Sequence, residues 1–99
     1  MQLEFEDDEL EKLYTDRDYR VASLNPDAAK AFRKKMGLLK DASDERDLFA
    51  MRSLRLEKLE GKRDGQWSIR LNDQWRAILT FESVENRRIV HVLELVDYH

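Results

Sequence analysis

The chain has 99 residues, a net charge of −3, and 39% charged against 41% hydrophobic residues. We therefore expect one domain over residues 1–99, with a small core and a densely ionic surface, and exclude a multidomain machine. Because there is no cysteine, disulfides, thiolate catalysis and cysteine-based zinc sites are excluded and a cytoplasmic location is expected. The first 20 residues hold eight acidic side chains and no long apolar run, which predicts neither a signal peptide nor a membrane span.

The N-terminal segment predicts a short strand followed by a short helix. Residues 2–6 alternate polar and apolar side chains, as an edge strand does. Asp7 or Asp8 can cap the helix that follows. The apolar residues of this helix recur at helical spacing for about two turns, and the pattern fades in the charged run 16–18.

The clearest helix begins at Asn25-Pro26. Asn25 can accept hydrogen bonds from the free N–H groups of the first turn, and Pro26 supplies the φ angle of a first helical residue. Residues 41–47 are rich in capping side chains and predict one more short helical turn before Leu48 and Phe49. The apolar stripe of the long helix is predicted to face the core and comprises Ala28, Phe32, Met36 and Leu39.

From Leu54 onward the apolar residues alternate, which indicates strands. Residues 54–59 are predicted to open the first strand, and residues 60–65 form a turn in which two glycines are available for positive φ. Residues 67–71 and 75–82 then alternate on either side of a hairpin turn at Asn72-Asp73.

The last strand differs from the others because it is apolar throughout. Residues 85–88 are predicted to form a turn, and residues 89–96 have the composition of a mid-sheet strand covered on both faces. His91 within it is predicted to be structural. The fold class is α+β, with two or three N-terminal helices on one face of a curved, mainly antiparallel sheet of four or five strands.

Alternation places several polar side chains on the sheet face opposite the helices. The guanidinium groups of Arg70 and Arg76 offer planar forks of donors that match phosphate or carboxylate oxygens. Both lie within residues 52–76, where seven basic side chains accompany four acidic ones. These arginines either form a phosphate clamp or are neutralised by the many acidic residues. The polar set on this face comprises Ser68, Arg70, Asn72 and Arg76.

The sequence ends in three groups that can move protons or bind a reacting oxygen, Asp97, Tyr98 and His99. Histidine is the side chain whose unperturbed pKa lies near neutrality, and carboxylates beside it favour its charged form, which suits a general acid. The alternative is a loose polar tail without a role. Strict alternation separates Tyr98 from the other two, so one shared site requires the strand to twist or end.

Four further residues have two interpretations each. Lys62 and Arg63 in the glycine turn either reach a phosphate or keep the turn soluble, and Trp67 and Trp75 are predicted to be core residues rather than base-stacking platforms. With only two histidines, far apart in the sequence, and no cysteine, we expect no metal site. No cofactor is expected.

The run 55–76, RLEKLEGKRDGQWSIRLNDQWR, and the ending 96–99, VDYH, closely resemble the HigB toxins, or plasmid maintenance killer proteins, of the RelE/ParE superfamily. The resemblance covers the second half of the chain with fixed gaps, whereas residues 1–47 agree in length and helical character. It implies a RelE-like fold and a type II toxin that cleaves messenger RNA on the ribosome. It also implies neutralisation by a HigA-type antitoxin.

The resemblance implies roles for several residues. Arg76 matches the family arginine that stabilises charge on the scissile phosphate, and Asp97, Tyr98 and His99 match the terminal catalytic group. Glu57 stands where some relatives have histidine. In addition, Glu60 stands where some relatives have lysine, so that this cation is either missing or replaced by Lys62 or Arg63, and Arg70 is a phosphate binder by geometry.

The implied reaction uses no metal. The ribose 2′-OH attacks the adjacent phosphorus while a base, Asp97 or Glu57, removes its proton. Arg76 and Arg70 stabilise the phosphorane, His99 protonates the departing 5′-oxygen, and Tyr98 orients or stacks.

The expected partners are the antitoxin, the ribosome and messenger RNA, with no membrane. A weakly acidic protein is not expected to bind free RNA tightly, because such binding depends on many phosphate contacts. Two alternatives remain, a ParE-like toxin that acts on DNA gyrase without nuclease activity and a non-catalytic RNA- or antitoxin-binding module. The polar ending favours the nuclease, because the gyrase poisons lack a matching acid–base end.

Overall fold

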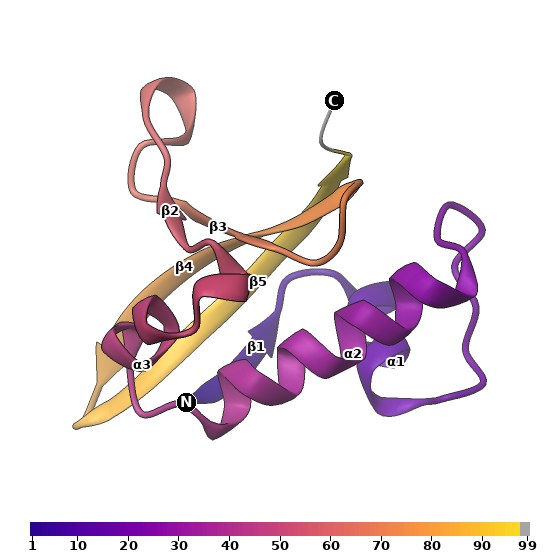
Figure 1. Cartoon of the computed structure of the whole chain (residues 1–99). Helices are drawn as coiled ribbons and strands as arrows, with labels where there is room; N and C mark the ends of the chain where they lie inside the picture. The colour runs from indigo at the N-terminus through magenta and orange to yellow at the C-terminus, as the bar shows by residue number, and fades with distance from the viewer. Residues whose placement is uncertain (98–99) are drawn as a thin grey trace.

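The computed structural model describes residues 1–97, and Tyr98 and His99 lie outside the described residues. One five-stranded sheet has the order β1-β5-β4-β3-β2. β1 runs parallel to β5, and the other neighbours are antiparallel. Figure 1 shows the helices on one side of this sheet. The strands are β1 (Gln2–Phe5), β2 (Glu57–Lys58), β3 (Trp67–Arg70), β4 (Trp75–Val84) and β5 (Arg87–Asp97).

Each helix begins at a side chain that caps its first turn. The Asp7 carboxylate accepts a hydrogen bond from the Glu9 amide, and the Asn25 side chain accepts one from the Ala28 amide. None of the helices within residues 1–97 is long and apolar enough to cross a membrane. The helices are α1 (Asp8–Thr15), α2 (Pro26–Asp41) and α3 (Glu45–Ala50).

A short helix, α3, begins within the capping-rich residues 41–47 as predicted, but it extends further than the predicted turn. Asp44 caps α3 by accepting from the Arg46 amide, and α3 then continues through Leu48 and Phe49. Leu48 is fully buried. The extra turn therefore places a leucine in the core that a loop at this position would leave uncovered.

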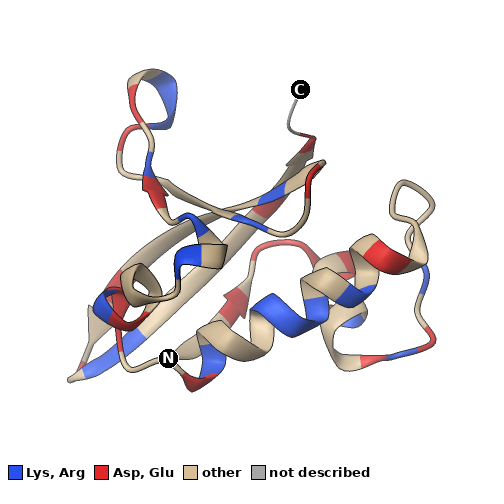
Figure 2. Ribbon diagram, in the orientation of Figure 1, with Lys and Arg blue, Asp and Glu red and all other residues tan. Residues whose placement is uncertain are grey.

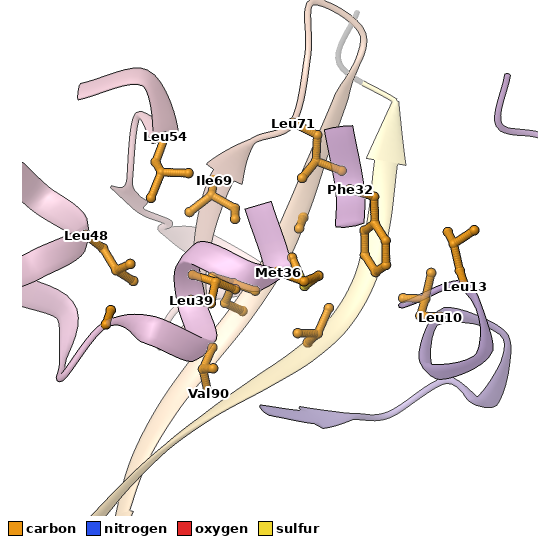
Figure 3. Close-up of a cluster of buried hydrophobic side chains, with 14 of the residues drawn as sticks. Leu10, Leu13, Phe32, Met36, Leu39, Leu48, Leu54, Ile69, Leu71 and Val90 are labelled. Atoms are coloured by element: carbon orange, nitrogen blue, oxygen red, sulfur yellow. The ribbon is translucent and has the colours of Figure 1, made fainter. Parts of the chain in front are cut away.

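The core lies between the sheet and α2. Phe32, Met36 and Leu39 project from one side of α2 and are fully buried, as their spacing predicts. Figure 3 shows these three side chains pointing at the strands, with side chains from α1, α3 and the sheet around them. The apolar contacts fix α2 on one face and leave the opposite face of the sheet for other chemistry.

Two segments of the chain differ from their predictions. Leu54 ends a short 3₁₀ helix, η1 (Arg52–Leu54), instead of opening a strand, and it is fully buried. The next residue, Arg55, has a φ of 46° and breaks the extended run. The β4–β5 turn consists of Glu85 and Asn86, both with positive φ, so the two arginines that follow belong to β5 rather than to the turn.

β5 lies in mid-sheet as predicted, but the prediction that it is covered on both faces was wrong. Helices cover one face only (Figure 1). On the other face the His91 ring lies between two carboxylates, with its Nε2 2.6 Å from Glu82 Oε1 and its Nδ1 3.4 Å from Glu6 Oε1. These contacts agree with a structural role for His91. A register shift at Ile78/Leu79 in β4 interrupts the long hairpin, and such bulges bend a sheet.

An ion pair joins α3 to the β4–β5 hairpin and makes the stability depend on pH. Arg88 Nε donates to Glu45 Oε1 at 2.7 Å, and its Nη2 donates to Glu45 Oε2. These hydrogen bonds lower the pKa of the Glu45 carboxyl. Because the folded-state pKa lies below the unfolded value of about 4.3, the contribution is present above that pH and is lost as the pH falls through the lowered pKa.

We expect Glu45→Gln to lower the free energy of unfolding by about 1–2 kcal/mol at neutral pH. The difference from the wild type should shrink as the pH falls below about 4. Urea unfolding across this pH range measures both effects. Glu11→Gln, a change at an exposed position of α1, is the control. A deficit that stays constant down to pH 3 would contradict this account.

Candidate functional site

A hollow of about 290 Å³ opens beside the β3–β4 turn. Figure 2 shows blue segments on β3, on β4 and on the chain leading into β2 close together at this place. Three arginines and two carboxylates contribute, so positive charge is in excess. The described residues that line the hollow are Arg55, Glu57, Arg70, Asn72, Asp73 and Arg76.

Arg70 and Arg76 are cross-strand partners on β3 and β4. Their strand neighbours Ile69 and Ala77 are fully buried in the core. Because side chains alternate along a strand, both arginines point to the face opposite the helices. The structure therefore brings the two guanidinium groups together, as the alternation predicts.

The Arg76 guanidinium is held in one orientation. The residue is only 6% exposed. Its Nη2 donates to the main-chain oxygen of Arg55 at 2.9 Å and lies 3.8 Å from Glu57 Oε1. A buried charge needs such partners, and here they come from Arg55, directly after η1, and from Glu57 at the start of β2.

Arg55 adopts the left-handed conformation, with φ 46° and ψ 53°, as the C-cap of η1. Its N–H donates to the Arg52 carbonyl, and its own carbonyl is the acceptor for Arg76. Sequence analysis did not identify Arg55 as a site residue. No local signal marks it, because left-handed residues are usually glycine or asparagine.

Arg70 is paired with a carboxylate from the turn that follows it. Its Nη2 donates to Asp73 Oδ1. The turn is built by Asn72, whose side-chain oxygen accepts from the amides of Gln74 at 2.9 Å and Trp75 at 2.8 Å. The sequence predicts this turn and places Asn72 on the polar face of the sheet, but it does not identify Asp73 as a residue of the site. Arg70 and Arg76 thus each line the hollow and lie beside a carboxylate.

Arg70 lies within electrostatic reach of a lysine on α2. Partial burial, Lys34 and Arg70 together lower the pKa of the Lys35 ammonium, in that order of effect. Two of these three causes are nearby cations, which disfavour a further positive charge.

Asp97 lies beside the hollow but is not among its lining residues. It is the cross-strand partner of Trp75, whereas the residue before it, Val96, is the cross-strand partner of Arg76. Its Oδ2 accepts from Gln74 Nε2 at 3.1 Å. Tyr98 and His99, the other members of the expected terminal group, lie outside the described residues.

The structure does not bring Lys62 or Arg63 into the hollow, as judged from the described lining residues. Both belong to the second 3₁₀ helix, η2 (Gly61–Arg63). Arg63 donates from Nη1 to Gln66 Oε1 at 3.0 Å, and its Nη2 lies 3.2 Å from Glu94 Oε1 on β5. The loop is therefore linked to β5, with Lys62 exposed on it.

The fold is shared with solved structures of bacterial toxins. The chain resembles the YoeB/ParE toxin from Agrobacterium tumefaciens, with a TM-score of 0.61 and 21% identity over 100% of both chains. The YoeB-YefM complex from Staphylococcus aureus gives a TM-score of 0.59 and 17% identity, over 100% of this chain and 97% of that chain. These likenesses confirm the expected RelE-like α+β fold.

Sequence comparison is more specific than the fold. Toxin HigB-1 of Vibrio cholerae serotype O1 is 40% identical over 78 residues, which cover 79% of this chain and 81% of that protein. The family model of the HigB-like toxin, described as the RelE-like toxin of type II toxin-antitoxin system HigB, matches residues 3–99. The chain therefore belongs to the HigB-like toxins of type II toxin–antitoxin systems.

Proposed function

We propose that this toxin is a ribosome-dependent endoribonuclease that cleaves messenger RNA and thereby stops translation. One observation carries the proposal. Arg70 and Arg76 face the same hollow from adjacent strands, and the Glu57 carboxylate lies 3.8 Å from the Arg76 guanidinium. Cations beside a carboxylate supply both the charge stabilisation and the proton acceptor that transesterification at a phosphate requires.

The reaction needs two proton transfers, one from the substrate to a base and one from an acid to the leaving group. Glu57 accepts the proton of the ribose 2′-OH while the 2′-oxygen forms a bond to phosphorus. Arg76 and Arg70 donate hydrogen bonds to the phosphorane oxygens as negative charge accumulates there. The bond from phosphorus to the 5′-oxygen then breaks, and His99 donates a proton to the leaving oxygen. The products are a 2′,3′-cyclic phosphate and a free 5′-hydroxyl, with Tyr98 orienting the substrate.

Geometry favours Glu57 over Asp97 as the base. Glu57 lines the hollow beside Arg76, whereas the Asp97 side chain accepts a hydrogen bond from Gln74 and is not among the described lining residues. A general base must lie within reach of the proton that it removes. We propose that Asp97 has a positioning role for the neighbouring Tyr98 and His99 rather than a role as the base.

The ribosome is proposed to supply the positioning of the substrate. The net charge is −3, and the described lining residues include only three arginines. Binding to free RNA depends on the number of phosphates neutralised, so this surface is expected to bind free RNA weakly. A ribosome that holds the codon in place makes tight binding of RNA by the toxin itself unnecessary.

The partner of this toxin is an antitoxin, because the family consists of toxins of type II toxin–antitoxin systems. We propose that the antitoxin is of the HigA type. The proposal is supported by the HigB identity of both the family model and the Vibrio cholerae relative.

Mapping of transcript 5′ ends after brief induction of the toxin tests the nuclease function. We expect messages cut within codons, and we expect His99→Ala to prevent the cuts while the protein still accumulates. Intact messages together with a loss of DNA supercoiling would support a gyrase poison instead. Intact messages with normal supercoiling would point to a non-catalytic binding module.

A further inference from the structure

The proposed reaction leaves one cation of the hollow without a role. The hollow has three guanidinium groups and two carboxylates. Asp73 is paired with Arg70, and Glu57 lies beside Arg76. The exposed side chain of Arg55 forms no ion pair with another residue within the described range 1–97. Arg55 is therefore the source of the excess positive charge.

The backbone of Arg55 gives a second, independent observation. Its left-handed conformation, with φ 46° and ψ 53°, is costly for any residue with a Cβ atom and easy for glycine. Backbone strain of this kind is concentrated at functional sites. The conformation turns the Arg55 carbonyl toward Arg76 Nη2, 2.9 Å away. Glycine would satisfy that geometry, so an arginine here indicates that its side chain is used as well.

We propose that Arg55 is a further substrate-binding residue, whose side chain contacts an RNA phosphate next to the scissile one while its carbonyl positions Arg76. This inference depends on the proposed nuclease function. In that reaction Arg70 and Arg76 bind the scissile phosphate. Arg55 lines the same hollow and is then available to bind the neighbouring phosphate of the RNA. The ligand class is a single-stranded ribonucleotide with at least two phosphates.

Substitutions at this one position separate the two roles. Arg55→Ala and Arg55→Gly remove the same charge, but only glycine adopts the left-handed conformation without strain. Arg55→Lys retains the charge. Arg87→Ala is the matched control, since Arg87 is exposed at the β4–β5 hairpin and does not line the hollow. Each purified protein is assayed for cleavage of a defined message on programmed ribosomes, with ribosome concentration and salt varied.

The side-chain role predicts a change in substrate affinity. Arg55→Ala and Arg55→Gly are expected to raise KM for programmed ribosomes about tenfold, the effect of one lost charge-assisted hydrogen bond. They should also reduce the slope of log affinity against log salt by about one. Arg55→Lys should retain the slope, and Arg87→Ala should match the wild type in both quantities.

The backbone role predicts a difference between two variants that have lost the same charge. Arg55→Gly should keep the wild-type kcat. Arg55→Ala should keep kcat as well, because its Cβ imposes the same strain as that of the wild-type arginine. The Tm of Arg55→Ala should be about 4–8 °C below that of Arg55→Gly.

Three results would overturn the inference. Wild-type KM and salt slope in both uncharged variants would show that the side chain does not contact RNA. Equal Tm in Arg55→Ala and Arg55→Gly would show that residue 55 is not left-handed and that its carbonyl is not turned toward Arg76 in this way. A wild-type protein that leaves the message intact on programmed ribosomes would refute the proposed function itself, and the inference with it, before any variant is compared.

Discussion

Replacing Arg76 by alanine is expected to lower the rate of messenger cleavage by about 10²–10³-fold, the usual effect of removing one donor to a developing negative charge. Arg76 is only 6% exposed and is held by the Arg55 carbonyl and by Glu57. Its guanidinium is thus oriented before substrate binds, and no reorganisation is needed in the transition state. Single-turnover cleavage on programmed ribosomes measures the effect.

Arg76→Lys is the informative companion. Lysine retains the charge but lacks the planar fork that bonds a carbonyl and a phosphate together. We expect it to recover only a small part of the lost rate. Urea unfolding of each variant verifies the fold, and a loss of about 1–2 kcal/mol is expected because the hydrogen bond to the Arg55 carbonyl is lost or weakened. Alanine and lysine variants that cleave at the wild-type rate would exclude Arg76 from the reaction.

Glu57→Gln is expected to lower cleavage by about 10²–10⁴-fold, because glutamine keeps the shape and one acceptor oxygen of glutamate but cannot take up the 2′-OH proton. The Glu57 side chain is 59% exposed. Its replacement should therefore leave the free energy of unfolding within about 0.5 kcal/mol of the wild type. The same single-turnover assay, with unfolding measured beside it, separates the catalytic effect from any loss of folded protein.

Asp97→Asn is the matched control for Glu57→Gln. Both variants replace a carboxylate near the hollow by its amide, but only Glu57 lines the hollow among the described residues. The amide oxygen that Asp97→Asn introduces can still accept from Gln74, so we expect less than about a tenfold loss of rate. Greater damage from Asp97→Asn than from Glu57→Gln would reverse the assignment and make Asp97 the base.

The fold was predictable wherever local chemistry and burial agree. Asn25 and Pro26 mark the start of α2, and the spacing from Phe32 to Leu39 describes its buried side. Prediction failed at residues 54–59, where alternating leucines resemble a strand. There the core takes up Leu54 completely and Arg55 turns left-handed, so the extended run shrinks to β2. Burial by distant elements outweighs a local pattern of a few residues.

Within the site, alternation along β3 and β4 was sufficient to bring Arg70 and Arg76 together. It could not supply Arg55, because the contact between its carbonyl and Arg76 joins residues 21 positions apart. The ion pair between Arg63 and Glu94 likewise joins positions 31 apart and directs Arg63 to β5. Contacts of this range depend on how the chain returns to the sheet.

The amino-acid sequence by itself determined the α+β class, the helix starts and the shared face of two arginines, because capping, helical spacing and strand alternation act over a few residues. Only the tertiary structure decided which groups surround those arginines. Burial of Arg76 requires partners, and the fold provides them in the Arg55 carbonyl just after η1 and the Glu57 carboxylate on β2.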